Sequence, residues 1–238
     1  MNPKVLVGVP VCNLYEYCFD EFIDNLKNLT YSNYEILLVD NSKDDIFFER
    51  IKSLNINVFK LPYFEKMRDR VTGSHNKIRE YFLKNNFDYL LILDQDIIPP
   101  LDVIEKLIIH KKDAISALFF GNHNIPNGEN RIMPFAWKFI EKDGFWGTTY
   151  YLNDNEISSD SLIEIAFAGM GCILLSKKIL NELEFRYDLS MEAWDDRWLG
   201  YDIHRLGFNY YLDSKVKCKH LYLKRPFNYH QIKAKGLV

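Results

Sequence analysis

The chain lacks the features that mark several protein classes. Its four cysteines, Cys12, Cys18, Cys172 and Cys218, form no C-x-x-C pair, so we expect free thiols in a reducing cytoplasm and no disulfide framework. The N-terminal apolar run stops at Pro10, which is too short for a signal peptide. No apolar run approaches the ~18 residues of a membrane-spanning helix. Neither G-x-G-x-x-G nor G-x-x-x-x-G-K-[ST] occurs, which argues against a dinucleotide site and a P-loop.

An excess of one charge is also missing. The 30 Lys and Arg residues nearly balance the 33 Asp and Glu residues, for a net charge of -3, which argues against nucleic acid held mainly by charge. No linker rich in proline or glycine divides the chain, so we expect one domain over residues 1–238. Aromatic side chains are abundant, at 15% of all residues; they fill cores and also stack on sugars and bases.

The first half of the chain alternates strand and helix patterns. The strand patterns are short apolar runs, and the helix patterns repeat apolar residues every three or four positions. This alternation predicts an α/β fold with a mostly parallel, doubly wound sheet. The predicted strands are Lys4–Val9, Tyr34–Val39, Asn57–Lys60, Tyr89–Leu93 and Ala114–Leu118, and the predicted helices are Tyr15–Leu29, Ile46–Leu54, Ser74–Leu83 and 102–110.

The second half has a different pattern. Two runs, Phe135–Glu141 and Phe145–Tyr151, flank a turn sequence with Gly144 and predict a hairpin. Asp195–Leu206 predicts a helix that Gly207 ends. Further predicted elements are the strands Ile173–Ser176, Tyr210–Leu212 and Val216–Tyr222 and the helix Lys177–Leu183. We therefore expect a nucleotide-binding half at 1–120, a ligand-facing half at 121–222 and a basic C-terminal tail at 223–238.

Polar side chains follow three of the predicted strands, where an open α/β sheet binds its ligands. The segments are Pro10–Asn13, Asp40–Asn41 and Asp94–Asp96. Asp94-Gln95-Asp96 is the only D-x-D in the chain, and two carboxylates just past a buried strand can reach toward one hard cation. Mg²⁺ or Mn²⁺ bound there would bridge a diphosphate.

Taken together, the order and spacing of these features resemble a nucleotide-sugar-dependent glycosyltransferase of the GT-A fold, similar to glycosyltransferase family 2. The resemblance spans roughly Lys4 to Tyr222. It rests on the strand before Pro10, the LLVDNS run around Asp40, Arg70-x-x-Gly73-x-x-Asn76, the LILDQD run, the GMGCILLS block at 169–176, Asp195-Asp196 and His220. The fold that it implies has a Rossmann-like central sheet with helices on both faces and a small hairpin region on the acceptor side.

The resemblance implies a role for each matching residue. Pro10, Cys12, Asn13 and Gln95 would line the nucleotide, Asp40 would hydrogen-bond its base or ribose, and Arg70 and Asn76 would border the base and phosphates. Asp94 would face the ribose or a metal-bound water, Asp96 would ligate the metal, and His220 would be a further ligand that favours Mn²⁺ over Mg²⁺. Gly169 would allow a close backbone approach to the donor sugar. From charge and position alone, Lys224 and Arg225 would close over the diphosphate.

Asp195-Asp196 stands where the family usually has Glu-Asp. The resemblance implies that one carboxylate is the general base that takes the proton of the acceptor hydroxyl, with inversion at the sugar. Spacing to Gly207 favours Asp196. Acidic residues also stabilise a helix N-terminus without any catalytic role, and a retaining reaction would need no such base, so both alternatives stay open. Glu192 is another carboxylate close by in sequence.

Aromatic residues gather on the predicted hairpin and beside Asp195-Asp196, although core packing accounts for many of them. Trp146 and Trp194 are the candidates to stack on an acceptor. The resemblance implies a UDP- or GDP-sugar donor and a carbohydrate, lipid-linked or protein hydroxyl acceptor, with peripheral membrane contact through the basic tail as an option. Two alternatives are a sugar-phosphate nucleotidyltransferase, whose Gly-rich loop is missing here, and a non-catalytic carbohydrate- or nucleotide-binding module.

Overall fold

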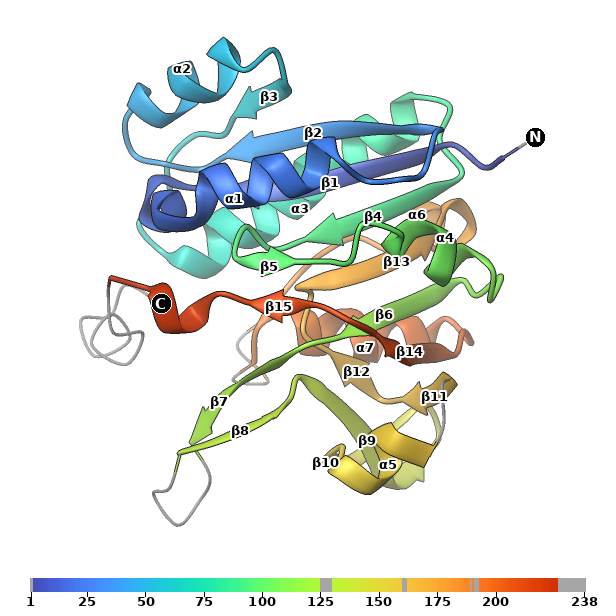
Figure 1. The fold of residues 1–238 in the computed structure, drawn as a ribbon. Coiled ribbons are helices and arrows are strands. Elements are labelled where there is room, and N and C mark those ends of the chain that lie inside the picture. Colours follow the sequence, from blue (N-terminus) through green and yellow to red (C-terminus); the bar gives the residue numbers. More distant parts are fainter. Residues whose placement is uncertain (1, 125–129, 160–161, 189, 191–192, 227–238) are drawn as a thin grey trace.

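A computed structural model of the protein describes residues 2–124, 130–159, 162–188, 190 and 193–226. Its centre is an eight-stranded sheet with the order β11-β14-β6-β13-β4-β1-β2-β3 (Figure 1). Six strands run in one direction, and β13 and β11 run opposite to their neighbours. The strands are β1 (Val5–Val11), β2 (Tyr34–Asp40), β3 (Asn57–Lys60), β4 (Tyr89–Leu93), β6 (Ala114–Leu118), β11 (Leu162–Ile165), β13 (Cys172–Ser176) and β14 (Tyr210–Lys217). The predicted mostly parallel α/β sheet is confirmed.

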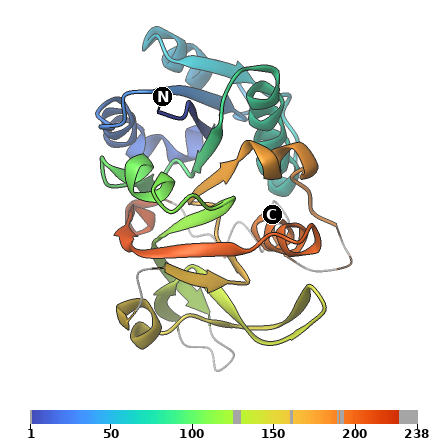
Figure 2. The same ribbon diagram turned by 90° about the vertical axis from the view of Figure 1, so that its right-hand side faces the viewer.

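Helices cover both faces of this sheet. Alternate residues of a strand point to opposite faces, so Val5, Val7 and Val9 of β1 pack in one core and Leu6 packs in the other. In Figure 2, the blue and green helices α1 and α4 lie on one side of the sheet, and the teal and orange helices α3, α6 and α7 lie on the other. The helices are α1 (Glu16–Lys27), α2 (Ile46–Ser53), α3 (Met67–Lys84), α4 (Val103–Ile108), α5 (Asp154–Ser159), α6 (Lys177–Glu182) and α7 (Asp195–Arg205).

Smaller sheets extend the molecule below the central one (Figure 1). The predicted hairpin forms as β9 and β10, and β12 joins it to make three strands. Gly144 has a φ of +63° in its turn, which glycine adopts without a steric penalty. The remaining elements are β5 (Ile97–Ile98), β7 (Phe120–Asn124), β8 (Asn130–Pro134), β9 (Ala136–Asp143), β10 (Trp146–Tyr151), β12 (Phe167–Ala168), β15 (Lys219–His220), η1 (Asn13–Tyr15) and η2 (Tyr222–Lys224).

Several elements differ from the sequence expectation. α3 begins at Met67, two turns before the predicted start at Ser74. The sequence pattern misses these two turns because they are mostly polar and lack an apolar stripe. β7 and β8 form a hairpin that the polar run Phe120–Asn124 does not predict. β14 is continuous through Asp213 and Ser214, whose buried side chains interrupt the apolar pattern. Among the described residues, no helix combines the length and apolar character needed to cross a membrane.

Candidate functional site

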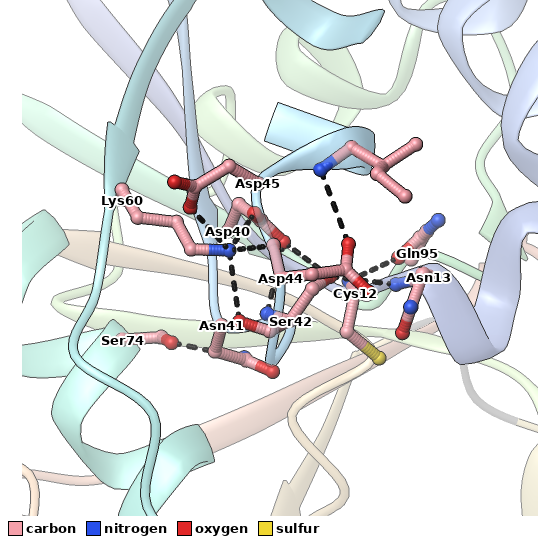
Figure 3. A network of polar contacts seen from close by, with 11 residues as sticks. Cys12, Asn13, Asp40, Asn41, Ser42, Asp44, Asp45, Lys60, Ser74 and Gln95 are labelled. Atoms are coloured by element: carbon pink, nitrogen blue, oxygen red, sulfur yellow. Dashed lines mark hydrogen bonds and ion pairs between the residues drawn. The ribbon is translucent and has the colours of Figure 1, made fainter. Parts of the chain in front are cut away.

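The carboxyl ends of β1, β2 and β3 form one polar corner (Figure 3). Asp40, at the end of β2, is fully buried. Its Oδ1 accepts hydrogen bonds from Ser42 N and Oγ at 3.0 and 2.6 Å, and its Oδ2 lies 2.8 Å from Lys60 Nζ. Lys60 is the register partner of Asp40 on β3. Ser42 and Lys60 thus surround the Asp40 carboxylate, and its predicted hydrogen bond to the base or ribose stays a prediction.

Gln95 links the D-x-D segment to this corner. Its Oε1 accepts a hydrogen bond from Cys12 N at 2.8 Å, and its Nε2 donates to Tyr15 O at 3.1 Å. Asn13 N donates to Ser42 Oγ at 2.9 Å. The predicted donor-binding segment Pro10–Asn13 is therefore held between the ends of β2 and β4. Cys12 is partly exposed there, and burial raises the pKa of its thiol to about 11, so the sulfur stays protonated at neutral pH.

The two predicted donor residues of α3 have different surroundings. Arg70 donates to the carbonyls of Phe64 and Glu65 at 2.5 and 2.9 Å and lies over the Tyr63 ring at 4.9 Å. It therefore organises the loop between β3 and α3. Asn76 was predicted to border the phosphates, but both ends of its amide are used elsewhere. Its Nδ2 donates to Phe185 O at 2.7 Å and its Oδ1 accepts from Phe185 N at 3.0 Å.

Asp96, His220 and Arg225 meet at the end of β4. Asp96 is 2% exposed. Its Oδ2 accepts from Arg225 Nε and Nη2 at 2.9 and 2.6 Å and lies 3.5 Å from His220 Nε2. Tyr17 Oη also donates to this oxygen at 3.3 Å. Burial opposes ionisation of Asp96, but the hydrogen bonds and charges of His220 and Arg225 outweigh it and lower its pKa.

The ring of His220 is held on both sides, by a backbone carbonyl and by Arg225. Its Nδ1 lies 2.8 Å from the carbonyl of Phe120, which can only accept, so Nδ1 carries the proton and Nε2 of the neutral ring presents a lone pair. That lone pair accepts a hydrogen bond from Arg225 Nη2 at 3.2 Å, and the same nitrogen lies 3.5 Å from Asp96 Oδ2. Within the described residues, no group of three or more His, Cys, Asp or Glu side chains forms a metal-binding cluster. The structure thus pairs Asp96 with His220 but does not gather Asp94 into a three-ligand set with them.

A second carboxylate group lies at the start of α7. Asp195 and Asp196 begin α7, and their surroundings differ sharply. Asp195 is 5% exposed, and its Oδ2 lies 2.8 Å from Nδ1 of the buried His75 on α3. Asp196 Oδ1 accepts from Arg197 N at 2.6 Å. Burial, with the nearby charges of Asp195 and Asp94, raises the pKa of Asp196 to about 7.

Asp94 belongs to the same electrostatic neighbourhood. Burial and the charge of Asp96 raise the pKa of Asp94 to about 6, while His75 and His220 act in the opposite direction. Like charges in a low-dielectric site cannot all ionise easily. The charges of Asp94, Asp195 and Asp196 therefore act on one another at the carboxyl edge of the sheet.

The predicted acceptor residues are engaged in packing. Trp146 lies edge to face with Phe139 and Tyr201, with ring centroids 5.5 Å apart in each pair, and packs against the main core. It therefore closes the hairpin onto α7 and offers little of its face to a sugar. Trp194, directly before the two aspartates, lies under the guanidinium of Arg68 at 5.4 Å. The structure keeps Trp194 beside the carboxylates and moves Trp146 into the core boundary.

Two other predicted contacts have different partners in the structure. A Cβ on Gly169 would lie 3.0 Å from the Phe119 ring and 3.1 Å from the Phe135 ring, so packing against these rings leaves little room for a side chain, and its approach to a donor sugar stays a prediction. Lys224 Nζ donates to Glu21 at 2.9 Å, as does Lys219 at 2.8 Å, which fastens the tail to α1. Of the tail, 227–238 lies outside the described residues, as does Glu192.

Sequence reasoning missed several residues of this edge. Lys60 ends the short, half-buried strand β3, directly beside Asp40 at the end of β2. The sequence signal that could have found it is a lysine at the end of a predicted strand parallel to the one that ends at Asp40. Tyr17 and His75 lie on helices whose amphipathic pattern does not distinguish them. His123, on the unpredicted β7, lies 4.2 Å from the Phe135 ring, and burial followed by the charge of His220 lowers its pKa to about 4.

Comparison with known proteins fits this geometry. The family model described as "Glycosyl transferase family 2" matches residues 6–184, about three quarters of the chain. A dolichol-phosphate mannosyltransferase from Pyrococcus furiosus is 31% identical over 142 residues, which are 58% of this chain and 38% of that protein. The chain thus matches well under half the length of that relative.

Solved structures share the fold at low sequence identity. TarS 1–349 from S. aureus in complex with UDP has a TM-score of 0.55 and 14% identity, covering 90% of this chain and 59% of that one. The same protein with UDP-GlcNAc gives 0.56 and 14%, covering 90% and 57%. The match to the family model, supported by this GT-A architecture, shows that the chain belongs to glycosyl transferase family 2.

Proposed function

We propose that this protein is a glycosyltransferase that moves a sugar from a nucleoside diphosphate to a hydroxyl acceptor, with inversion and with help from a divalent cation. The observation that carries the proposal is the meeting of two groups at one edge of the sheet. Asp96 and His220 are paired after β4, and the charge of Asp94, two residues before Asp96, contributes to the raised pKa of Asp196. Such an edge can stabilise a leaving diphosphate and take a proton from an incoming hydroxyl.

The nucleotide would lie along the corner made by Pro10–Asn13 and the end of β2. The side chains of Gln95 and Ser42 accept hydrogen bonds from the backbone N–H groups of Cys12 and Asn13, so this segment is ordered before the donor binds. Preformed polar groups of this kind need little ordering on binding. Complexes of TarS with UDP and UDP-GlcNAc make uridine donors the first to test, and GDP-sugars are the second.

Asp96 and His220 would hold the cation, with diphosphate oxygens and water as its remaining ligands. When bound, the cation neutralises the negative charge that grows on the leaving group. Arg225 now donates two hydrogen bonds to the same Asp96 oxygen. We therefore expect Arg225 to exchange partners, leaving Asp96 for the diphosphate as the donor binds. Its bidentate guanidinium suits phosphate oxygens as well as carboxylates.

Asp196 is the base that we assign. A general base works best when its pKa lies near the working pH, and burial with two nearby carboxylates brings Asp196 to about 7. Asp195 is less suited because His75 already binds its Oδ2. Asp196 would accept the hydroxyl proton while the acceptor oxygen attacks the anomeric carbon and the bond to the diphosphate breaks. That direct displacement gives inversion.

A donor-hydrolysis and transfer screen tests the proposal. The protein is incubated with UDP-, GDP- and dTDP-sugars and Mn²⁺, without acceptor and with simple glycoside or polyprenyl phosphate acceptors, the latter because of the mannosyltransferase relative. We expect release of one nucleoside diphosphate and its loss in Asp96→Ala, which should remain folded by circular dichroism. Release of no nucleoside diphosphate from any donor, or full activity of Asp96→Ala, would refute it. Binding of a donor without turnover would instead favour a binding module.

A further inference from the structure

His75 is buried in the proposed site, and none of the roles assigned above uses its second ring nitrogen. The residue is 1% exposed, and its ring centroid lies 5.3 Å from that of Phe185. Its Nδ1 lies 2.8 Å from Asp195 Oδ2. Its Nε2 is buried and has no hydrogen-bond partner among the residues that the structure describes. Buried polar atoms are nearly always paired, so an unpaired nitrogen in a binding site points to a group that a ligand supplies.

The bond to Asp195 determines what this nitrogen can bind. A carboxylate accepts, so Nδ1 carries a proton. Nε2 then presents a lone pair when the ring is neutral and an N–H when it is charged. A hydroxyl group can both donate and accept, so it satisfies Nε2 in either state. An ionised phosphate oxygen can only accept. The chemistry of the pair therefore favours a hydroxyl-bearing ligand over the diphosphate.

The location of His75 points to one part of the donor. In a direct displacement, the transferred sugar lies between the leaving diphosphate and the base. Here Asp96, which would adjoin the diphosphate, and Asp196, the assigned base, bound that interval. His75 Nδ1 lies 2.8 Å from Oδ2 of Asp195, the residue that directly precedes Asp196. The imidazole is thus placed beside the base, where the anomeric end of the transferred sugar must lie.

We propose that His75 is a donor-sugar-binding residue: its Nε2 hydrogen-bonds a hydroxyl of the transferred sugar, and Asp195 fixes the orientation of its ring. This inference rests on the proposed function, because it takes the donor to be a nucleotide sugar. It also gives Asp195 a task that differs from that of Asp196, since Asp195 acts through the imidazole. His75 would then contribute to the choice among donor sugars that differ in one hydroxyl.

The test separates the two ring nitrogens. His75→Asn places an amide N–H close to the position of Nδ1 and keeps a donor for Asp195, but nothing replaces Nε2. Calorimetry measures the binding of UDP and of UDP-GlcNAc to wild type and to the variant. If the screen selects another donor, that nucleotide sugar and its nucleoside diphosphate are used instead. We expect the affinity for the diphosphate to change less than twofold and that for the nucleotide sugar to fall about tenfold, which is about 1.4 kcal/mol.

A matched control is available at a second histidine–aspartate pair, whose histidine is half-buried. His110 Nε2 lies 2.8 Å from Asp213 Oδ2, so His110→Gln keeps an amide at the bonded nitrogen of a pair that lies outside the proposed site. It should leave both affinities unchanged. A purely structural His75 would give a His75→Asn variant with wild-type affinities, or with both affinities reduced equally, and either result would overturn the inference.

Two safeguards keep the outcome clear. If wild type binds neither the diphosphate nor the nucleotide sugar, the proposed function fails; if it binds both and His75→Asn does not separate them, only the role of His75 fails. Should His75→Asn not fold, ¹⁵N-histidine spectra of wild type decide. The His75 Nε2 resonance should move with the nucleotide sugar and not with the diphosphate alone. Equal movement with both ligands, or none, would contradict the proposal.

Discussion

Replacing Asp196 with Asn should make the protein more stable and far less active. The side chains are nearly the same size, but Asn carries no charge. In the folded protein the pKa of Asp196 is raised from 3.8 to about 7 by burial and then by the charges of Asp195 and Asp94. The folded state therefore binds this proton more tightly than the unfolded state does. Stability from this proton is fully present below about pH 4 and is lost as the pH rises toward 7.

The size of the effect follows from the shift of about three pKa units. At about 1.4 kcal/mol per unit, ionised Asp196 costs about 4 kcal/mol of folding free energy at pH 8 and about 2 kcal/mol at pH 5. Asp196→Asn removes this cost. For a chain of this length, 1 kcal/mol moves the melting temperature by about 2–4 °C, so the variant should melt roughly 10 °C higher at pH 8, with a smaller gain at pH 5.

Activity should change in the opposite direction. Loss of a general base lowers turnover by about 10²–10⁴-fold, and wild-type turnover should rise with pH through about 7 as Asp196 ionises. The assays are urea unfolding at pH 5 and 8 and initial transfer rates from pH 5 to 9. A variant that is less stable at both pH values, or a stability gain that does not grow with pH, would refute the electrostatic reasoning. Wild-type turnover by the variant would refute the base assignment.

Two further predictions concern charges at the edge of the sheet. Lys60→Met leaves Asp40 buried without its cation and should lower the free energy of unfolding by about 3 kcal/mol in urea titrations. The control Lys52→Met breaks an exposed ion pair and should change this free energy by less than about 0.5 kcal/mol. Equal effects of the two substitutions would contradict the prediction. Arg225→Gln frees Asp96 and should tighten the binding of Mn²⁺ in the absence of donor, measured by calorimetry. The KM for the donor should rise about tenfold, because the charge-assisted hydrogen bond from Arg225 to the diphosphate is lost. An unchanged affinity for Mn²⁺ would contradict the exchange of partners by Arg225.

The sequence predicts most of the frame that carries the site. Tyr89–Leu93 forms the predicted strand. This apolar run is too short for a typical helix and is followed by Asp94, and Pro99 and Pro100 prevent a helix from continuing through the next residues. The carboxyl edge follows from the parallel arrangement of β1, β2 and β4. These local patterns bring the D-x-D segment beside the Pro10–Asn13 loop without any knowledge of long-range contacts.

What the sequence does not predict depends on contacts between distant segments. Asp195 and Asp196 are chemically equal neighbours at one helix start, and the contact of Asp195 with His75, 120 positions away, could not be predicted from their spacing. Asn76 carries a suitable side chain at a suitable spacing, but the Phe185 backbone binds both ends of its amide. Gly169 has the form of a ligand-approach glycine, while the rings of Phe119 and Phe135 explain it.

The central claim is that the edge around Asp96 binds a nucleoside diphosphate together with a cation. A thermal-shift measurement tests it directly, with UDP, GDP and dTDP and their sugars, each with and without Mn²⁺, on wild type and Asp96→Ala. A ligand at 100 times its Kd stabilises the folded state by about 2.7 kcal/mol, which is roughly 5–10 °C here. We predict such a shift for one nucleotide with Mn²⁺ and its loss in Asp96→Ala. No shift with any nucleotide, or an equal shift in the variant, would contradict the claim.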